Sequence, residues 1–240
     1  KVIVTGCLGA KAQSDGQNFV KAMHPSVLAV TGPHATQEVM DAVHTHLPKP
    51  HDPFIDLVPA AGIKLTPKHY AYLKISEGCN RTCSFCAIPL MRGEHRSKPM
   101  EELILEAEKL VKMGVKELML IAQELTYYGL DLYKKRMLPE LLKKLAAVEG
   151  IEWIRLHYAY PSKFPLDIID VMKEEPKICN YLDMPLQHAS DNMLKAMKRQ
   201  ITRQEMKDLI GEIRSRIPSI CLRTTLIAGF PGETKGDVEE

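Results

Sequence analysis

The fold of this chain is decided by one stretch, Tyr70-Ala71-Tyr72-Leu73-Lys74-Ile75-Ser76-Glu77-Gly78-Cys79-Asn80-Arg81-Thr82-Cys83-Ser84-Phe85-Cys86. Its first six residues alternate and are rich in aromatic and branched side chains, which predicts a β-strand over 70–75. Three cysteines follow at once, with the spacing C-x3-C-x2-C. Parallel α/β folds place their chemistry at the carboxyl ends of strands, so this position predicts a functional site.

Beyond the cysteines, strand-type and helix-type segments alternate to the end of the chain. A helix is predicted to begin at Pro99, as its first helical residue, and to close at Gly114. The remaining strands are predicted at Glu117–Ala122, Trp153–Tyr158, Tyr181–Met184 and Leu222–Ala228. The helices between them are predicted at Leu138–Val148, Pro165–Glu174 and Gln204–Arg216. Repeated β-α units form a parallel sheet with right-handed crossovers. Five units are too few for a closed eight-fold barrel, so the α/β fold predicted is a partial, open β/α barrel.

The region before this barrel predicts part of a small α/β domain. Its strands are expected at Lys1–Thr5 and Ser26–Thr31, and its helices at Asn18–Met23 and Thr36–Thr45. A proline-rich stretch follows, and such a stretch favours an extended connector. The predicted organisation is therefore a first domain over 1–47, a linker over 48–67 and the barrel over 68–240. The chain starts at a lysine and stops in acidic sequence, so we expect it to be a fragment of a longer protein.

The composition is that of an ordinary globular protein. Of 240 residues, 45% are hydrophobic and 26% are charged. The longest apolar runs, such as Leu118–Ala122, are too short to cross a bilayer, so no membrane contact is expected. The net charge of +2 gives no reason to expect nucleic-acid binding through charge alone. Six cysteines, three of them clustered, and no signal region suggest a metal site in a reducing compartment, the cytoplasm.

The three clustered thiols suit either an iron–sulfur cluster or zinc, because thiolates are soft ligands. A four-iron cluster normally takes four cysteines. Three local thiolates would leave one iron without a protein ligand and free to bind a small molecule. A zinc site is the alternative and would need a fourth ligand, for which His95 and His69 are the candidates. Zinc pairs usually have C-x2-C or C-x4-C spacing and a second pair further along, and the sequence has no second pair.

The cysteine spacing, with aromatic Phe85 before the last cysteine, resembles the signature of the radical SAM superfamily. Within it, essentially all 240 residues are similar to the methylthiotransferases, and most of all to those that modify ribosomal protein S-twelve. Two stretches carry this closer likeness, Ile88-Pro89-Leu90-Met91-Arg92-Gly93 and His157-Tyr158-Ala159-Tyr160-Pro161. The tRNA-modifying relatives typically have Tyr-Thr-Arg-Gly and Ser-His-Pro versions of these. Both types share Leu186-Gln187-His188 and Phe230-Pro231-Gly232-Glu233-Thr234.

The resemblance implies an enzyme that attaches a methylthio group to the β-carbon of an aspartate in the small-subunit ribosomal protein S-twelve. It implies S-adenosylmethionine as cofactor and a catalytic [4Fe-4S] cluster on Cys79, Cys83 and Cys86. A second [4Fe-4S] cluster would use Cys7 as its third ligand, with two further cysteines upstream. An electron donor such as flavodoxin is also implied. The family's sixth barrel strand and its carboxyl-terminal TRAM domain, through which RNA contact is possible, are missing here.

The same resemblance assigns contacts to S-adenosylmethionine, each with a plainer alternative. Phe85 would contact the adenine, although a core role competes. Gln123 and Glu124, after the second barrel strand, would face the amino group, or form a solvated helix cap. Gln187 follows the fourth strand and would touch cofactor or substrate. The remaining candidates are Arg199 and Arg223 for the carboxylate, with surface ion pairs as the alternative, and Gly229 for close backbone approach to the adenine.

Overall fold

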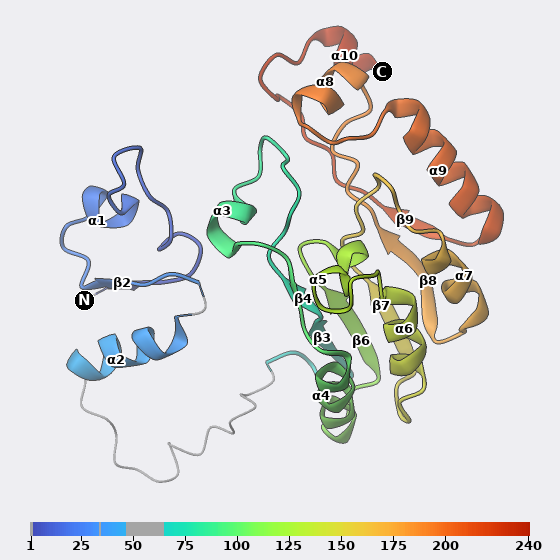
Figure 1. The fold of residues 1–240 in the computed structure, drawn as a ribbon, viewed down its shortest axis with the longest axis horizontal. Helices are drawn as coiled ribbons and strands as arrows, with labels where there is room; N and C mark the ends of the chain where they lie inside the picture. Colours follow the sequence, from blue (N-terminus) through green and yellow to red (C-terminus); the bar gives the residue numbers. More distant parts are fainter. Residues whose placement is uncertain (1, 34, 47–64) are drawn as a thin grey trace. The chain divides into compact units, whose positions relative to one another are not determined.

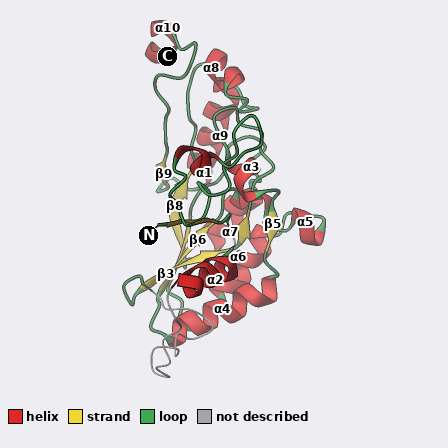
Figure 2. Cartoon of the chain, turned by 90° about the vertical axis from the view of Figure 1, so that its left-hand side faces the viewer, coloured by secondary structure: helices red, strands yellow, loops and turns green. Residues whose placement is uncertain are grey.

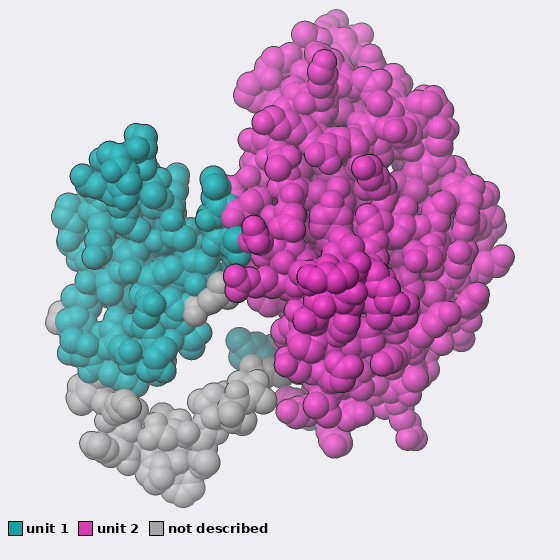
Figure 3. All heavy atoms as spheres, viewed as in Figure 1, with its two compact units in different colours: residues 1–65, 90–93 teal, residues 66–89, 94–240 magenta. Residues whose placement is uncertain are grey.

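The computed structural model describes residues 2–33, 35–46 and 65–240. The chain divides into two compact units, which Figure 3 colours separately. The first holds Lys1–Leu65 with Leu90–Gly93, and the second holds Thr66–Pro89 with Glu94–Glu240. Most of the predicted linker, residues 48–64, lies outside the described residues. The predicted domain boundaries therefore stay predictions.

The first unit contains a two-stranded parallel sheet and two helices. Strand β1 (Ile3–Val4) pairs with β2 (Ala29–Val30). Both strands are shorter than the sequence predicts. Helix α1 (Phe19–Met23) begins at Asn18, whose side chain accepts hydrogen bonds from two backbone N–H groups of the first turn. Helix α2 (Thr36–His46) closely matches its prediction.

The second unit is built on an open parallel sheet, as predicted. In the described residues its order is β3-β6-β7-β8-β9, with every neighbouring pair parallel. The strands are β3 (Tyr70–Lys74), β6 (Glu117–Ile121), β7 (Trp153–Leu156), β8 (Ile178–Asp183) and β9 (Cys221–Arg223). Figure 1 shows them side by side, so their carboxyl ends meet along one edge of the sheet.

Four helices return the chain between the strands: α4 (Met100–Lys112), α6 (Leu138–Ala146), α7 (Asp167–Glu174) and α9 (Arg203–Arg216). Figure 2 marks them in red beside the yellow strands. The expected first helical residue was wrong by one position, because Pro99 has extended backbone and is the N-cap of α4. Gly114 has a φ of 93° and ends this helix as predicted.

The core lies between the helices and one face of the sheet. Leu73, Leu118 and Ile154 are fully buried there, on three adjacent strands. Burying a leucine side chain contributes roughly 2 kcal/mol. The opposite face is more open, because Tyr72 and Trp153 are about half exposed. Burial alternates in this way along β3 and β7, and such an alternation fixes the register of a sheet.

A small hairpin closes the cysteine segment at its base. Strand β4 (Ser76–Glu77) pairs antiparallel with β5 (Arg96–Ser97), and the Lys98 N–H donates to the Ile75 carbonyl at 2.9 Å. Residues 78–95 therefore leave the sheet and return to it at one place. They include α3 (Ile88–Arg92), which the sequence did not predict.

The last predicted strand was wrong in its length. β9 ends at Arg223, whereas the sequence predicts a strand to Ala228. Its partner β8 ends at Asp183, and Pro185 beyond it has no N–H to donate. Pairing resumes only at Gln187, which forms one isolated bridge with Leu226.

Four further short elements complete the described second unit: η1 (Leu125–Tyr127), α5 (Leu130–Tyr133), α8 (Asp191–Ala196) and α10 (Lys235–Glu239). None of the helices in the described ranges combines the length and the apolar character needed to cross a bilayer.

Candidate functional site

Three cysteines line one small pocket, of about 20 Å³, beside the carboxyl ends of β3 and β6. Cys79 is buried, Cys83 and Cys86 are half-buried, and all three thiols are free. The other lining residues are Arg81, Phe85, Ile88, Gln123, Tyr158, Tyr160 and Arg199. The structure thus brings the predicted residues Phe85, Gln123 and Arg199 to the predicted thiols.

The cysteine loop is anchored through its backbone. The Cys86 N–H donates to the Cys83 carbonyl at 3.1 Å and closes a turn. Between them, Ser84 binds the end of α8, because its N–H donates to the Met197 carbonyl at 3.1 Å and its hydroxyl to the Ala196 carbonyl at 2.8 Å. These bonds hold two of the three thiols on a loop that is tied to a helix distant in sequence.

The protein environment keeps the Cys79 thiol protonated. Burial raises the pKa of Cys79, and this outweighs the hydrogen bond that its sulfur accepts from the Arg81 N–H at 3.4 Å. The nearby Glu124 carboxylate and the other two thiols also raise this pKa. A metal bound here would have to displace the proton, as thiolate ligation requires.

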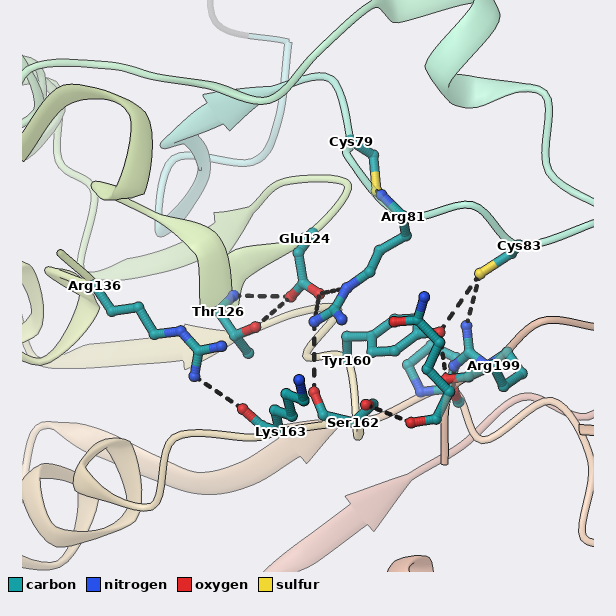
Figure 4. Close-up of polar contacts among 12 residues, drawn as sticks. Cys79, Arg81, Cys83, Glu124, Thr126, Arg136, Tyr160, Ser162, Lys163 and Arg199 are labelled. Atoms are coloured by element: carbon teal, nitrogen blue, oxygen red, sulfur yellow. Dashed lines mark hydrogen bonds and ion pairs between the residues drawn. The ribbon is translucent and has the colours of Figure 1, made fainter. Parts of the chain in front are cut away.

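Arg81 and Glu124 form a buried ion pair behind the cysteines, as Figure 4 shows. The two atoms Arg81 Nη2 and Glu124 Oε2 lie 2.9 Å apart, and Arg81 Nε donates to the same oxygen at 3.0 Å. The other oxygen of Glu124 accepts from the Thr126 N–H and hydroxyl, at 2.9 and 2.8 Å. Glu124 is fully buried, so these contacts give it the role of holding Arg81 in place. Its expected contact with S-adenosylmethionine stays a prediction.

Tyr160 lies between two arginines. The Arg81 guanidinium carbon is 3.8 Å from the centre of its ring, and that of Arg199 is 4.1 Å away. The Tyr160 hydroxyl donates to the Arg199 carbonyl at 2.7 Å and lies 3.6 Å from the Cys83 sulfur. Burial raises the pKa of Tyr160 well above its usual range, so the phenol stays neutral. The pocket wall therefore carries two arginines, and because Glu124 compensates the charge of Arg81, the charge of Arg199 is the one that favours an anionic occupant.

Gln123 offers an unused acceptor at the pocket. Its side-chain nitrogen donates to Glu77 Oε1 at 2.9 Å, which orients the amide. Its Oε1 atom is buried and has no hydrogen-bond partner among the described residues. A buried carbonyl oxygen without a partner is costly, so a ligand with an N–H donor would be favoured here.

The other predicted cofactor contacts, Gln187, Arg223 and Gly229, do not line the cysteine pocket. Gln187 has a φ of 75° and uses its backbone to bridge the last two strands. Arg223 pairs with Asp183, at 2.9 Å between Nη1 and Oδ2. The Gly229 N–H donates to Glu233 Oε2 at 2.6 Å, and its φ of 77° suits glycine. The roles of these three residues in binding stay predictions.

The two histidines considered as a fourth zinc ligand differ in position. His69 precedes β3, at the opposite end of this strand from Cys79. His95 is buried, and its Nε2 lies 3.3 Å from the Ser97 hydroxyl. Among the described residues, no three His, Cys, Asp or Glu side chains converge on one metal ion. The thiolates of an iron–sulfur cluster instead bind separate irons, so they need only line a common pocket.

Cys7 lies in the first unit, after β1 and Gly6. Its sulfur accepts a hydrogen bond from Arg92 Nε at 3.1 Å. Arg92 is grouped with this unit. Ligation of a second cluster by Cys7 stays a prediction.

Sequence reasoning missed Arg81 as a residue of the site. Its position between two cysteines was an available signal, because a cation inside such a loop must lie close to their sulfurs. The stacking of Arg81 and Arg199 on Tyr160 had no comparable signal, since these residues are far apart in the chain.

Comparisons with known proteins identify the family of this chain. A family model described as the radical SAM superfamily matches residues 73–240. A ribosomal protein uS12 methylthiotransferase RimO from Burkholderia vietnamiensis is 53% identical, and the match covers 100% of this chain and 56% of that protein. A protein of the same name from Cupriavidus pinatubonensis is 56% identical, with 100% and 55% covered. The chain thus spans just over half the length of these relatives.

Solved structures share the fold. The radical S-adenosylmethionine methyltransferase TsrM from Kitasatospora setae, with cobalamin and a [4Fe-4S] cluster bound, has a TM-score of 0.56 at 20% identity, covering 70% of this chain and 33% of that one. Coproporphyrinogen III oxidase (HemN) from Escherichia coli has a TM-score of 0.50 at 19% identity, covering 71% and 40%.

Proposed function

This chain belongs to the radical SAM superfamily, and from that premise we propose that Cys79, Cys83 and Cys86 bind a [4Fe-4S] cluster that activates S-adenosylmethionine. The observation that carries the proposal is the pocket that all three thiols share, lined by two buried arginines. Three soft sulfur donors and a cationic wall fit an anionic iron–sulfur cluster in their chemistry. One iron would keep an open position, because the loop supplies three cysteines.

When bound and reduced, such a cluster supplies the electron that cleaves S-adenosylmethionine to a 5′-deoxyadenosyl radical. The chain's residues bind and orient the cofactor. Gln123 Oε1, which has no partner among the described residues, would accept a hydrogen bond from the cofactor's ammonium group, and Phe85 would pack against the adenine. Arg81, held by Glu124 and stacked on Tyr160, fills the pocket wall and keeps water out.

For the whole protein we propose methylthio transfer to the β-carbon of an aspartate in ribosomal protein uS12 (S-twelve). Its support is the printed name of the relatives, which are 53–56% identical over the full chain. A second cluster would use Cys7 and supply the sulfur. The electron would come from a donor such as flavodoxin. The reaction belongs in the cytoplasm, where ribosomal proteins and reducing conditions occur together, and RNA contact would pass through a carboxyl-terminal domain.

Modification of a tRNA adenosine is the second candidate function, and a structural zinc site is the third. They are separated by measurements on the full-length protein purified without oxygen. Iron and acid-labile sulfide counts near four each per bound cluster, with 5′-deoxyadenosine on reduction, support the cluster assignment. Stoichiometric zinc without sulfide would contradict it.

The substrate is tested by offering uS12 and a tRNA anticodon stem-loop to the same preparation. We expect uS12 to gain one methylthio group on an aspartate, detected by mass spectrometry of its peptides. Modification of the stem-loop alone would instead favour the tRNA function.

A further inference from the structure

Arg199 is a buried cation without a carboxylate partner among the described residues. Its exposed fraction is 1%, and no carboxylate of the described residues lies within ion-pair distance of it. Arg81, the other buried arginine of the pocket, has Glu124 as its partner at 2.9 Å. A buried charge is costly unless an opposite charge compensates it. Arg199 therefore calls for an anion that the carboxylates of the described chain do not supply.

The contacts of Arg199 point its charge at one cysteine. Nη1 donates to the Cys83 sulfur at 3.4 Å, and Nη2 donates to the Pro185 carbonyl. Nε is buried without a partner, and the Tyr160 ring lies against the guanidinium face. Among these groups, only the Cys83 sulfur takes a negative charge when it binds a metal.

The fold fixes Arg199 with unusual backbone on both sides. Lys198 and Gln200 both have a φ of 56°, which lies in the left-handed region that side chains other than glycine rarely adopt. The Arg199 N–H donates to the Leu194 carbonyl at 2.9 Å, and the Ser162 hydroxyl donates to the Gln200 carbonyl at 2.6 Å. Backbone strain persists only where surrounding contacts over-determine it, and it is concentrated at functional sites.

We propose that Arg199 is a positioning residue that acts as the fixed counter-charge of the iron–sulfur cluster at Cys83 and raises the cluster's reduction potential. Reduction adds an electron, and the adjacent guanidinium stabilises the more negative reduced state. This role rests on the proposed cluster and is separate from the cofactor contact expected from the sequence. It operates before S-adenosylmethionine binds.

The test is a redox titration of the full-length, anaerobically reconstituted protein without S-adenosylmethionine, monitored by electron paramagnetic resonance. It is done in a Cys7→Ala background, which removes a ligand of the proposed second cluster. At a fixed applied potential, Arg199→Gln should lower the ratio of reduced to oxidised cluster about tenfold, which equals a shift of about 59 mV to more negative potential. Arg199→Lys keeps the charge and should restore most of the ratio. Lys198→Gln removes the neighbouring exposed charge and serves as the matched control, with the ratio unchanged.

An unchanged ratio in Arg199→Gln would overturn the proposal, because a residue that serves only the cofactor leaves the potential of the cofactor-free cluster untouched. If Arg199→Gln binds no iron, the iron content of each variant becomes the measurement. Arg199→Lys must then bind as much iron as the unaltered protein. If neither variant binds iron, Arg199 acts through the shape of its side chain and not through its charge. If the unaltered protein holds no four-iron cluster, the proposed function itself fails, before any variant is compared.

Discussion

The Arg81 guanidinium and the Glu124 carboxylate are paired at 2.9 Å with both side chains buried, and they join the cysteine loop to the end of β6. The pair spans 43 positions of the chain. Because Glu124 also accepts two hydrogen bonds from Thr126, it fixes Arg81 against a short turn of the scaffold. Glu124 therefore adds a buried ion pair to the backbone contacts that anchor the loop.

Neutralising that carboxylate should destabilise the fold. Glu124→Gln leaves the Arg81 charge buried without compensation, and we expect the free energy of unfolding to fall by about 3 kcal/mol in urea titrations. The matched control is Glu174→Gln, which breaks the exposed pair with Lys143 and should leave the urea midpoint unchanged. Equal, small effects of both substitutions would contradict the buried pair.

Cys83→Ala should abolish the cluster of this loop and 5′-deoxyadenosine formation in the anaerobically reconstituted full-length protein, so that only the iron of the proposed second cluster remains. The remaining two thiols of the loop cannot hold a cluster that needs at least three. Cys221→Ala removes an exposed thiol on β9 and is the control, with iron content and cleavage retained. Cofactor cleavage by the Cys83→Ala protein would show that the assigned ligands are wrong.

Gln123→Leu should weaken S-adenosylmethionine binding about tenfold, because it removes a buried acceptor for a charged donor. The measurement is anaerobic calorimetry on reconstituted protein of equal iron content. Gln204→Leu alters an exposed glutamine on α9, bonded to Asp208, and should not change the affinity. If both variants bind the cofactor as the unaltered protein does, Gln123 has no part in its recognition.

His95 makes stability depend on pH. Burial lowers the pKa of His95 below 6.5, and the charges of Asp131 and Glu124 only partly oppose this. The folded chain keeps the ring neutral where the unfolded chain takes up a proton. Stability is therefore full above pH 6.5 and falls as the pH drops through this value towards the folded-state pKa.

We expect the loss of unfolding free energy between pH 7.5 and 5.5 to be smaller in His95→Asn than in the unaltered protein. Urea titrations at both values give the difference. Substituting His24, which is exposed, provides the comparison and should preserve the full pH dependence. An identical pH dependence in His95→Asn would show that protonation of this ring does not cause the loss of unfolding free energy at low pH.

Local pattern was enough to predict the order of the five sheet strands and of the four helices between them. Helix α9 begins and ends within one residue of its prediction, since a capping box of Thr202 and Glu205 starts it. Strand ends were less predictable, because they depend on the neighbouring strand. β9 stops early since its partner turns away at Pro185, and nothing in the sequence of β9 itself signals this.

The same distinction applies to the site. The three thiols are neighbours in sequence, so their spacing alone predicted them. The contact between Tyr160 and the carbonyl of Arg199 depends on how β7 and α8 are placed by the sheet, at a separation of 39 positions. Such contacts follow from tertiary packing, which a local pattern does not encode.

The hairpin of β4 and β5 has a consequence for how this protein can change over evolutionary time. It pins both ends of residues 78–95 together, so the sheet does not depend on the length of the segment between them. Lengthening a closed loop costs little, about 0.6 kcal/mol for each doubling. Insertions after Cys86 can therefore accumulate over evolutionary time and give rise to new specificities, while the three cysteines and the sheet beneath them are inherited unaltered.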